Sequence, residues 1–367
     1  MERLIVFGGS FDPVHNGHIR IAQAASLALN ADVVFVPARS PRWKTTEATP
    51  EDRLAMLKKA IGGRTSGAFY IDPIELERNS PEDYSIDTIR ALQKKNPKRR
   101  LCLLIGADQV NEFPRWHEAK ALSQEADICF VRREGFVLND NIIREYHMSA
   151  IDYDKAGAVS SSAVRNLQSI DIPAPVLQYI EDHKLYFMKM IGTYLSKERL
   201  AHSIQVAHLS LAIAKRNQVI GADGAYIAGI LHDIGKGLPE ERARQIMKDN
   251  FPQYADYPAW ALHQFTGNYL AKTDFGITDE NILDAIEFHC TGKAHMPPLG
   301  KIIYSADKIE PTRGYDSSKL INECLKNYYV GFLAVLAENR RFMSGEGYNM
   351  EIPLANDCFS LYLGGKK

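Results

Sequence analysis

The fold is decided by the stretch Gly8-Gly9-Ser10-Phe11-Asp12-Pro13-Val14-His15-Asn16-Gly17-His18, which lies between an apolar run at 4–7 and an Ala- and Leu-rich helical pattern at 19–29. A strand that turns into a helix through glycines presents backbone N–H groups to a phosphate. The two histidines, three residues apart at the helix start, can face one phosphoryl group. The spacing is neither the G-x-G-x-x-G of a dinucleotide site nor the G-K-[ST] of a P-loop. The stretch therefore predicts an α/β fold with a phosphate site of another kind.

The rest of the first half alternates strand and helix patterns. We expect strands at 32–37, 68–71, 101–105 and 128–132, and helices at 19–29, 49–61, 84–96, 159–165 and 175–183. The run at 101–105 is apolar throughout, as in a parallel strand that is covered on both faces. These features predict a Rossmann-like, doubly wound parallel sheet.

Length and composition narrow the class of protein. With 367 residues the chain is too long for one ordinary core and suggests two domains. The net charge is −1, and positive and negative side chains balance in both halves, so we expect no nucleic-acid partner. No apolar run reaches membrane-spanning length and no signal peptide precedes the first strand, so we expect no membrane partner. Five scattered cysteines without C-x-x-C spacing fit a reducing, cytoplasmic location better than a disulfide framework.

Five segments, in order, resemble bacterial nicotinate-nucleotide adenylyltransferase over residues 1–188. They are 8–18, which holds the H-x-G-H signature of the nucleotidylyltransferase superfamily, 36–44, 83–90, 105–116 and 159–165. Members of this family transfer AMP from ATP to nicotinate mononucleotide, which gives deamido-NAD and pyrophosphate. A pantetheine-phosphate or cytidylyl transferase is the rival interpretation, and the segments at 83–90 and 105–116 argue against it.

The resemblance also implies the residues of the first site. The phosphate of the mononucleotide is itself the nucleophile, so the site must bring anions together and stabilise charge at the α-phosphorus. The expected catalytic residues are His15, His18, Lys44 and Arg165. The expected ATP- and substrate-binding residues are Gly8, Gly9, Ser10, Phe11, Thr88, Gly106, Asp108, Trp116, Ser161 and Ser162. Mg²⁺ is expected to arrive with ATP and bridge its phosphates.

Helical patterns dominate the second half, where the strand–helix alternation stops. They cover 197–217, 222–234, 240–248, 257–272, 279–288, 299–309 and 317–339. The helix start signal Ser196-Lys197-Glu198 places the domain boundary before it, near residue 190. We therefore expect an α/β domain over 1–190 and an all-α domain over 191–367.

Histidines and aspartates are the informative side chains of the second half. His232 and Asp233 are adjacent at the end of an apolar helical pattern, where a buried charge must be paired. One buried histidine is more often a satisfied core residue than a ligand, but this adjacent pair is harder to explain by packing. Imidazole and carboxylate together suit Fe, Mn or Zn, so the pattern indicates a transition-metal site.

The second half resembles the HD-domain phosphohydrolases over residues 193–367. The resemblance implies a basic set of metal ligands and two further ligands that occur in dinuclear members, and Asp233 would bridge the two ions. These six residues are His202, His232, Asp233 and Asp307, then His263 and His289. Six ligands shared by two ions leave room for a nucleophile derived from water. The expected cofactor is one or two transition-metal ions, iron first, with manganese or zinc as alternatives.

Within this family, the segments 225–236, 285–292 and 305–311 look closest to the bacterial HD hydrolases of diadenosine tetraphosphate, which yield two ADP. Lys236 and Arg313 are the expected phosphate contacts. His208 and His295 do not match the family, and we expect them to be structural and loop residues. Two alternatives stay open for this half: another nucleotide substrate, or a non-catalytic module that senses nucleotides or oligomerises. The chain is thus expected to be a bifunctional enzyme, and a homo-oligomer is left open.

Overall fold

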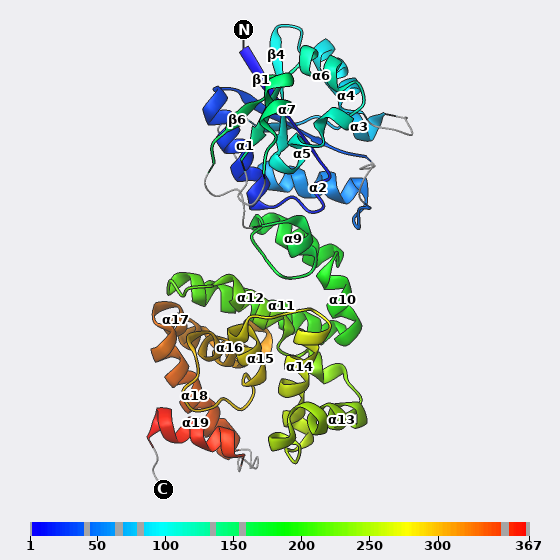
Figure 1. The fold of residues 1–367 in the computed structure, drawn as a ribbon. Coiled ribbons are helices and arrows are strands. Elements are labelled where there is room, and N and C mark those ends of the chain that lie inside the picture. Colours follow the sequence, from blue (N-terminus) through cyan, green and yellow to red (C-terminus); the bar gives the residue numbers. More distant parts are fainter. Residues whose placement is uncertain are drawn as a thin grey trace. The chain divides into compact units, whose positions relative to one another are not determined.

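The chain folds into two compact units, each with its own core. The structure, a computed structural model, describes residues 2–39, 45–62, 69–78, 84–132, 137–153, 159–345 and 352–364. Unit 1 comprises Met1–Arg165 and Asp171–Tyr186, and unit 2 comprises Asn166–Ile170 and Phe187–Lys367. The boundary that the sequence predicts near residue 190 falls within helix α10 (Phe187–Tyr194). Figure 1 shows a sheet covered by helices in unit 1 and helices alone in the described part of unit 2.

In its described residues, unit 1 is built on a parallel sheet of six strands in the order β3-β2-β1-β4-β5-β6. The strands are β1 (Glu2–Gly9), β2 (Asp32–Pro37), β3 (Phe69–Ile71), β4 (Arg99–Gly106), β5 (Asp127–Val131) and β6 (Ser149–Ile151). The strand order reverses between β1 and β4, and sheets of this kind bind ligands outside the carboxyl ends of the strands at such a switch point. The doubly wound fold class that the sequence predicts is confirmed.

The helices of unit 1 cover this sheet. They are α1 (Asn16–Leu29), α2 (Pro50–Ile61), α3 (Ile74–Glu77), α4 (Ser85–Lys95), α5 (Ala107–Val110), α6 (Ala119–Glu125), α7 (Asp140–Glu145), α8 (Ser161–Arg165) and α9 (Ala174–His183). α2 begins where local chemistry dictates, because Thr49 caps the N–H of Asp52 and Pro50 occupies the first helical position. β6 and most helices of seven residues or fewer are absent from the sequence predictions, since such short elements show too little periodicity.

Two cysteines of the sheet are paired. Cys102 on β4 and Cys129 on β5 have their sulfur atoms 2.21 Å apart. Spacing in the sequence does not reveal this single pair, because it is the pairing of neighbouring strands that brings the two residues together. The remaining cysteines, Cys290, Cys324 and Cys358, are unpaired.

Unit 2 consists of helices and short 3-10 turns in its described residues. After α10 come α11 (Lys197–Arg216), α12 (Asp223–Leu231), α13 (Glu240–Asn250), α14 (Leu262–Thr273), α15 (Glu280–Glu287), α16 (Pro298–Ile309), α17 (Ser318–Lys326), α18 (Tyr328–Gly345) and α19 (Pro353–Leu363). α11 and α12 pack backbone to backbone: a Cβ atom added to Gly229 would lie 2.6 Å from the Cα of Ala207. No helix among the described residues is long and apolar enough to cross a membrane.

Three helical predictions differ from the structure at their ends. The pattern at 222–234 ends as a helix at Leu231, and residues 234–237 form a 3-10 turn. The pattern at 257–272 becomes a regular helix only at Leu262. The pattern at 317–339 is two helices, because the Asn327 side chain accepts the N–H groups of Tyr329 and Val330 at 3.0 and 3.1 Å and so starts α18. α10 and α19 are absent from the sequence predictions.

Two candidate active sites

The two histidines of the signature stretch face each other at the start of α1. His15 is the N-cap residue, and its Nδ1 accepts the backbone N–H of His18 at 3.3 Å. The Nδ1 of His18 in turn accepts the N–H of His15 at 3.2 Å, and the two rings stack with their centroids 3.7 Å apart. Because both Nδ1 atoms accept, each neutral ring carries its proton on Nε2. The pair therefore places two stacked imidazole rings beside a helix N-terminus.

Gly17 is required by this arrangement. A Cβ atom at position 17 would lie 2.9 Å from the Nδ1 of His15 and 2.9 Å from a methyl group of Val159. The strand end before it is less constrained: a Cβ at Gly8 would meet nothing within 4 Å, and one at Gly9 would lie 3.0 Å from the ring of Phe11. Phe11 is buried and packs edge-on against His18, with centroids 5.1 Å apart.

Asp12 anchors the signature stretch, although it is not among the site residues expected from the sequence. Its carboxylate is fully buried and accepts the backbone N–H groups of Glu47 and Ala48, at 2.9 and 3.1 Å. It also accepts the hydroxyl of Tyr186 at 2.7 Å. Arg53, also fully buried, donates to the carbonyl oxygen of Ser10 at 2.8 Å. These contacts fix the signature stretch from its buried side.

Helix α8 brings the predicted hydroxyl and guanidinium groups to the same place. The hydroxyl of Ser161 donates to the carbonyl oxygen of Pro13 at 2.9 Å. Arg165 donates to the carbonyl oxygen of Asp12 at 2.6 Å, to the carboxylate of Glu47 at 2.6 Å and to the hydroxyl of Ser162 at 2.9 Å. The structure thus unites these residues with the signature stretch, and it occupies Arg165 with protein acceptors.

The predicted pyridine-side residues lie beyond β4 and on α4. The buried Thr88 donates its hydroxyl to Glu75 at 2.7 Å and its backbone N–H to the carbonyl oxygen of Tyr84 at 3.2 Å. Gly106 ends β4, and a Cβ there would lie 2.4 Å from the carboxylate of Asp108. Trp116 packs on Phe113 at 5.2 Å. Lys44 lies outside the described residues.

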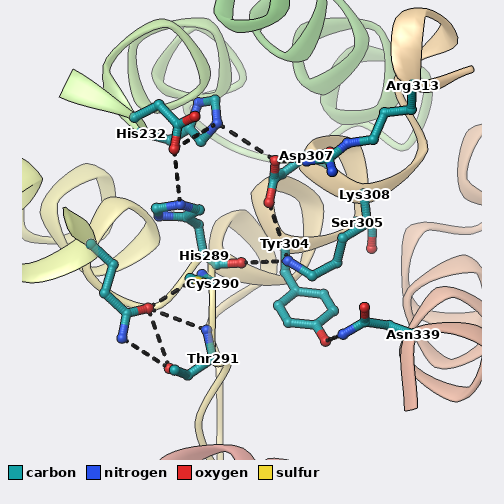
Figure 2. A network of polar contacts seen from close by, with 12 residues as sticks. His232, His289, Cys290, Thr291, Tyr304, Ser305, Asp307, Lys308, Arg313 and Asn339 are labelled. Atoms are coloured by element: carbon teal, nitrogen blue, oxygen red, sulfur yellow. Dashed lines mark hydrogen bonds and ion pairs between the residues drawn. The ribbon is translucent and has the colours of Figure 1, made fainter. Parts of the chain in front are cut away.

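In unit 2 the six predicted metal ligands converge from five places in the chain. His202 lies on α11, His232 and Asp233 follow α12, His263 lies on α14, His289 follows α15 and Asp307 lies on α16. The Oδ1 atom of Asp233 is 3.6, 3.5 and 3.6 Å from the Nε2 atoms of His232, His263 and His289. The Oδ1 atom of Asp307 is 3.2 and 3.6 Å from the Nε2 atoms of His202 and His232. Figure 2 shows His232, His289 and Asp307 pointing toward one another.

These residues form two overlapping groups that can each hold an ion. Position A has His202, His232 and Asp233, with Asp307 beside them. Position B has Asp233, His263 and His289. Asp233 belongs to both groups, which is the placement that a bridge between two ions would need. The two histidines outside the set lie elsewhere: His208 packs against Tyr226 with ring centroids 5.6 Å apart, and His295 lies outside the helices.

Two atoms of this cluster show that it fits a metal. Nε2 of His232 and Oδ1 of Asp233 are buried and have no hydrogen-bond partner among the described residues. A buried polar atom without a partner costs roughly 1–3 kcal/mol, and an ion between them would coordinate both. The protonation states also suit a cation. Burial would raise the pKa of Asp233, but His232 and His289 hold it well below its usual value, and burial lowers the pKa of His289.

Cationic side chains surround the cluster. Arg199 and Lys236 both bind the second oxygen of Asp233 at 2.9 Å, so only its Oδ1 faces the histidines. Arg313 contacts Asp307 at 2.5 Å and Lys308 contacts it at 3.2 Å (Figure 2). Lys236 and Arg313 are expected from the sequence, whereas Arg199 and Lys308 are not. Arg199 lies three residues before His202 on the same helix, and this spacing could have identified it.

Comparison with known proteins gives the two units their families. The cytidylyltransferase-like family matches residues 6–167 and the HD domain family matches residues 199–312. A Mycoplasma pneumoniae protein named "Probable nicotinate-nucleotide adenylyltransferase/Ap4A hydrolase" is 30% identical over 315 residues, which are 85% of this chain and 90% of that protein. The Mycoplasma genitalium protein of the same name is 28% identical and covers 91% of this chain and 97% of its own.

The chain belongs to the nicotinate-nucleotide adenylyltransferase/Ap4A hydrolase family. In this chain a cytidylyltransferase-like domain precedes an HD domain. Among solved structures, a Clostridium acetobutylicum protein described as a "predicted HD superfamily hydrolase involved in NAD metabolism" is 30% identical. It covers 47% of this chain and 94% of its own, with a TM-score of 0.42.

Proposed function

We propose that unit 1 transfers AMP from ATP to nicotinate mononucleotide, giving deamido-NAD and pyrophosphate. The observation that carries this proposal is the His15–His18 pair, whose ring N–H groups stand at the N-terminus of α1. Family membership supports it over most of the chain, because the Mycoplasma pneumoniae relative carries this activity in its name.

The chemistry needs charge stabilisation more than proton transfer. A phosphate oxygen of the mononucleotide bonds to the α-phosphorus of ATP as the bond to pyrophosphate breaks, so no covalent enzyme intermediate is needed. His15, His18 and Arg165 would stabilise the charge that develops there, together with Lys44. Ser161 and Ser162 would contact the ATP phosphates, and Mg²⁺ would arrive with the nucleotide.

We further propose that unit 2 hydrolyses diadenosine tetraphosphate to two ADP. The carrying observation is the pair of buried, unpartnered atoms on His232 and Asp233 at the centre of the ligand cluster. Position A and position B would each hold a transition-metal ion, iron first and manganese or zinc as alternatives. When bound, such ions lower the pKa of water and polarise a phosphoryl oxygen.

Side chains of unit 2 would hold the ions and bind the substrate. Four histidines and two aspartates would hold the ions, and Arg199 and Lys236 bind the second oxygen of Asp233, which leaves its Oδ1 for them. Lys236 and Arg313 would bind the phosphate chain. A water oxygen bonds to one of the two central phosphorus atoms and the central anhydride bond breaks, so each product is ADP.

A substrate assay on the purified full chain tests both proposals. ATP with nicotinate mononucleotide should give deamido-NAD, and diadenosine tetraphosphate should give ADP only when Fe²⁺, Mn²⁺ or Zn²⁺ is supplied after chelation. Hydrolysis of a different nucleotide would replace the proposed substrate. Nucleotide binding without hydrolysis, in metal-loaded protein, would make unit 2 a sensor. The cytoplasmic location stays a prediction from the sequence.

A further inference from the structure

His202 differs from the other three histidines of the metal cluster in what holds its outer ring nitrogen. The Nδ1 atoms of His232, His263 and His289 lie 2.6, 2.8 and 2.7 Å from backbone carbonyl oxygens. Nδ1 of His202 instead lies 2.9 Å from Oε1 of Glu310. Carbonyl and carboxylate oxygens only accept, so all four Nδ1 atoms donate, and in the neutral ring each Nε2 then carries the lone pair that an ion needs.

The position of each histidine in its helix explains the difference. Helix ends leave backbone groups without helical partners. His232 directly follows α12, His263 is the second residue of α14 and His289 lies two residues beyond α15, and each binds the carbonyl oxygen three residues earlier. His202 lies in the interior of α11, where the carbonyl groups within reach already accept helical N–H groups. Its acceptor must therefore come from another element.

Glu310 is held rigidly for this contact. It follows α16 directly, three residues beyond Asp307, and only 1% of its surface is exposed. Its Oε2 accepts the backbone N–H of Thr312 at 2.6 Å, and both oxygens lie 2.7 Å from the Thr312 hydroxyl. A buried carboxylate with both oxygens engaged has one orientation, and so fixes the ring that donates to it.

We propose that Glu310 is a positioning residue that sets the metal affinity of position A, and that position A therefore binds its ion more tightly than position B. Position A has two carboxylates and a histidine backed by a third, whereas position B has one carboxylate and histidines backed only by carbonyl groups. A carboxylate behind a ligand histidine makes the ring a better ligand, and its loss typically weakens metal binding about 10- to 100-fold. The inference rests on the proposed two-ion site.

The test is Mn²⁺ binding to chelator-treated full chain, measured as bound metal against free Mn²⁺. Wild-type protein should bind one ion more tightly than the other. Glu310→Gln should weaken the tighter ion about 10- to 100-fold and spare the weaker one, since an amide offers one acceptor where two are used. Thr312→Val should weaken binding of the same ion by a smaller factor, because the backbone N–H of residue 312 still holds the carboxylate of Glu310.

Glu287→Gln is the matched control. Glu287 is a half-buried carboxylate of the same unit, but its contact at 2.9 Å is with Asn268 rather than with a ligand histidine. It should bind both ions as wild type does. Wild-type affinity in both Glu310→Gln and Thr312→Val would overturn the inference, as would an equal loss of both ions with a lower melting temperature of the metal-free protein. A wild-type chain that binds no Mn²⁺, Fe²⁺ or Zn²⁺ would instead overturn the proposed hydrolase.

Discussion

The two candidate sites differ in whether their polar groups already have protein partners. In unit 1 the carboxylate of Asp12, the guanidinium of Arg165 and the hydroxyl of Thr88 are all bound by neighbouring residues. In unit 2 the described residues leave Nε2 of His232 and Oδ1 of Asp233 buried and without a hydrogen-bond partner. Where the cation arrives with the substrate, the polar side chains of the site can all have protein partners before the substrate binds. Where an ion is meant to stay, some polar atoms lack a hydrogen-bond partner until that ion binds.

Asp233→Asn should have the largest effect and tests the resident-ion half of this comparison. The substitution keeps the size of the side chain but removes the charge shared by positions A and B. Metal should be lost from at least one position, and hydrolysis of diadenosine tetraphosphate should fall to background. Adenylyl transfer should persist, because unit 1 has its own core. Both activities and bound metal are measured on the same preparation.

Two outcomes of that experiment would contradict us. If Asp233→Asn keeps its metal and its hydrolase rate, the two-ion interpretation is wrong. If the folded variant loses adenylyl transfer, the two units are not independent.

His18→Ala should have the next largest effect and tests the unit 1 half of the comparison. Loss of one donor that acts on the transition state should lower adenylyl transfer about 10²- to 10³-fold, with hydrolysis and metal content unchanged. The rate of deamido-NAD formation is the measurement. His183→Ala, which removes an exposed histidine of unit 1 stacked on Tyr179, is the control and should be neutral. Near-normal transfer in His18→Ala would exclude the proposed role.

Gly229→Ala should have a moderate effect on stability that is confined to unit 2. The added methyl group would meet the backbone of α11 at 2.6 and 2.9 Å, and a backbone cannot move aside as a side chain can. We expect a destabilisation of about 1–3 kcal/mol in urea unfolding. Gly224→Ala on the same helix meets side chains rather than backbone, Ile282 at 3.2 Å and Leu299 at 3.7 Å, and is the control. Equal stability of the two variants would show that α11 and α12 do not need this close approach.

Glu47→Gln should have the smallest effect. It tests whether the protein partners of the polar groups in unit 1 compete with the substrate. Glu47 is more than half exposed and occupies Arg165 at 2.6 Å, where a nucleotide phosphate would bind in the proposed reaction. Removing this competing anion should lower the KM for ATP a few-fold at unchanged kcat, since exposed ion pairs contribute only about 0–1 kcal/mol. Glu51→Gln, in the first turn of α2, is the charge-matched control. A raised KM would mean that Glu47 positions Arg165.

The sequence predicted the main elements and the ligand set for identifiable reasons. The four longer strands of the sheet are apolar runs between turn residues, and the structure has all four of them near their predicted ends. The clustering of the six side chains could be predicted because His232-Asp233 is unusual at the end of an apolar helical pattern and because the resemblance supplied the rest. Their roles in catalysis and in metal binding stay predictions.

Residues whose purpose depends on distant partners could not be predicted. Asp12 looks like one more polar residue of a turn, and its partners Ala48 and Tyr186 lie 36 and 174 residues away. Glu310 looks like the end of a helix until folding places it behind His202. Asn327 breaks a helical pattern by capping a helix, and the periodicity of the flanking residues does not reveal this.

The contact between Tyr186 and Asp12 also determines where the chain can be cut. α9 ends at His183, and a fragment stopped there would look complete by its secondary structure. It would nevertheless lack the Tyr186 hydroxyl, which donates a hydrogen bond to the buried carboxylate of Asp12 in the signature stretch. A protease site or a stop codon meant to free unit 1 must therefore fall after Tyr186, even though the next residue already begins α10. No residue separates Tyr186, which unit 1 needs, from Phe187, where α10 begins.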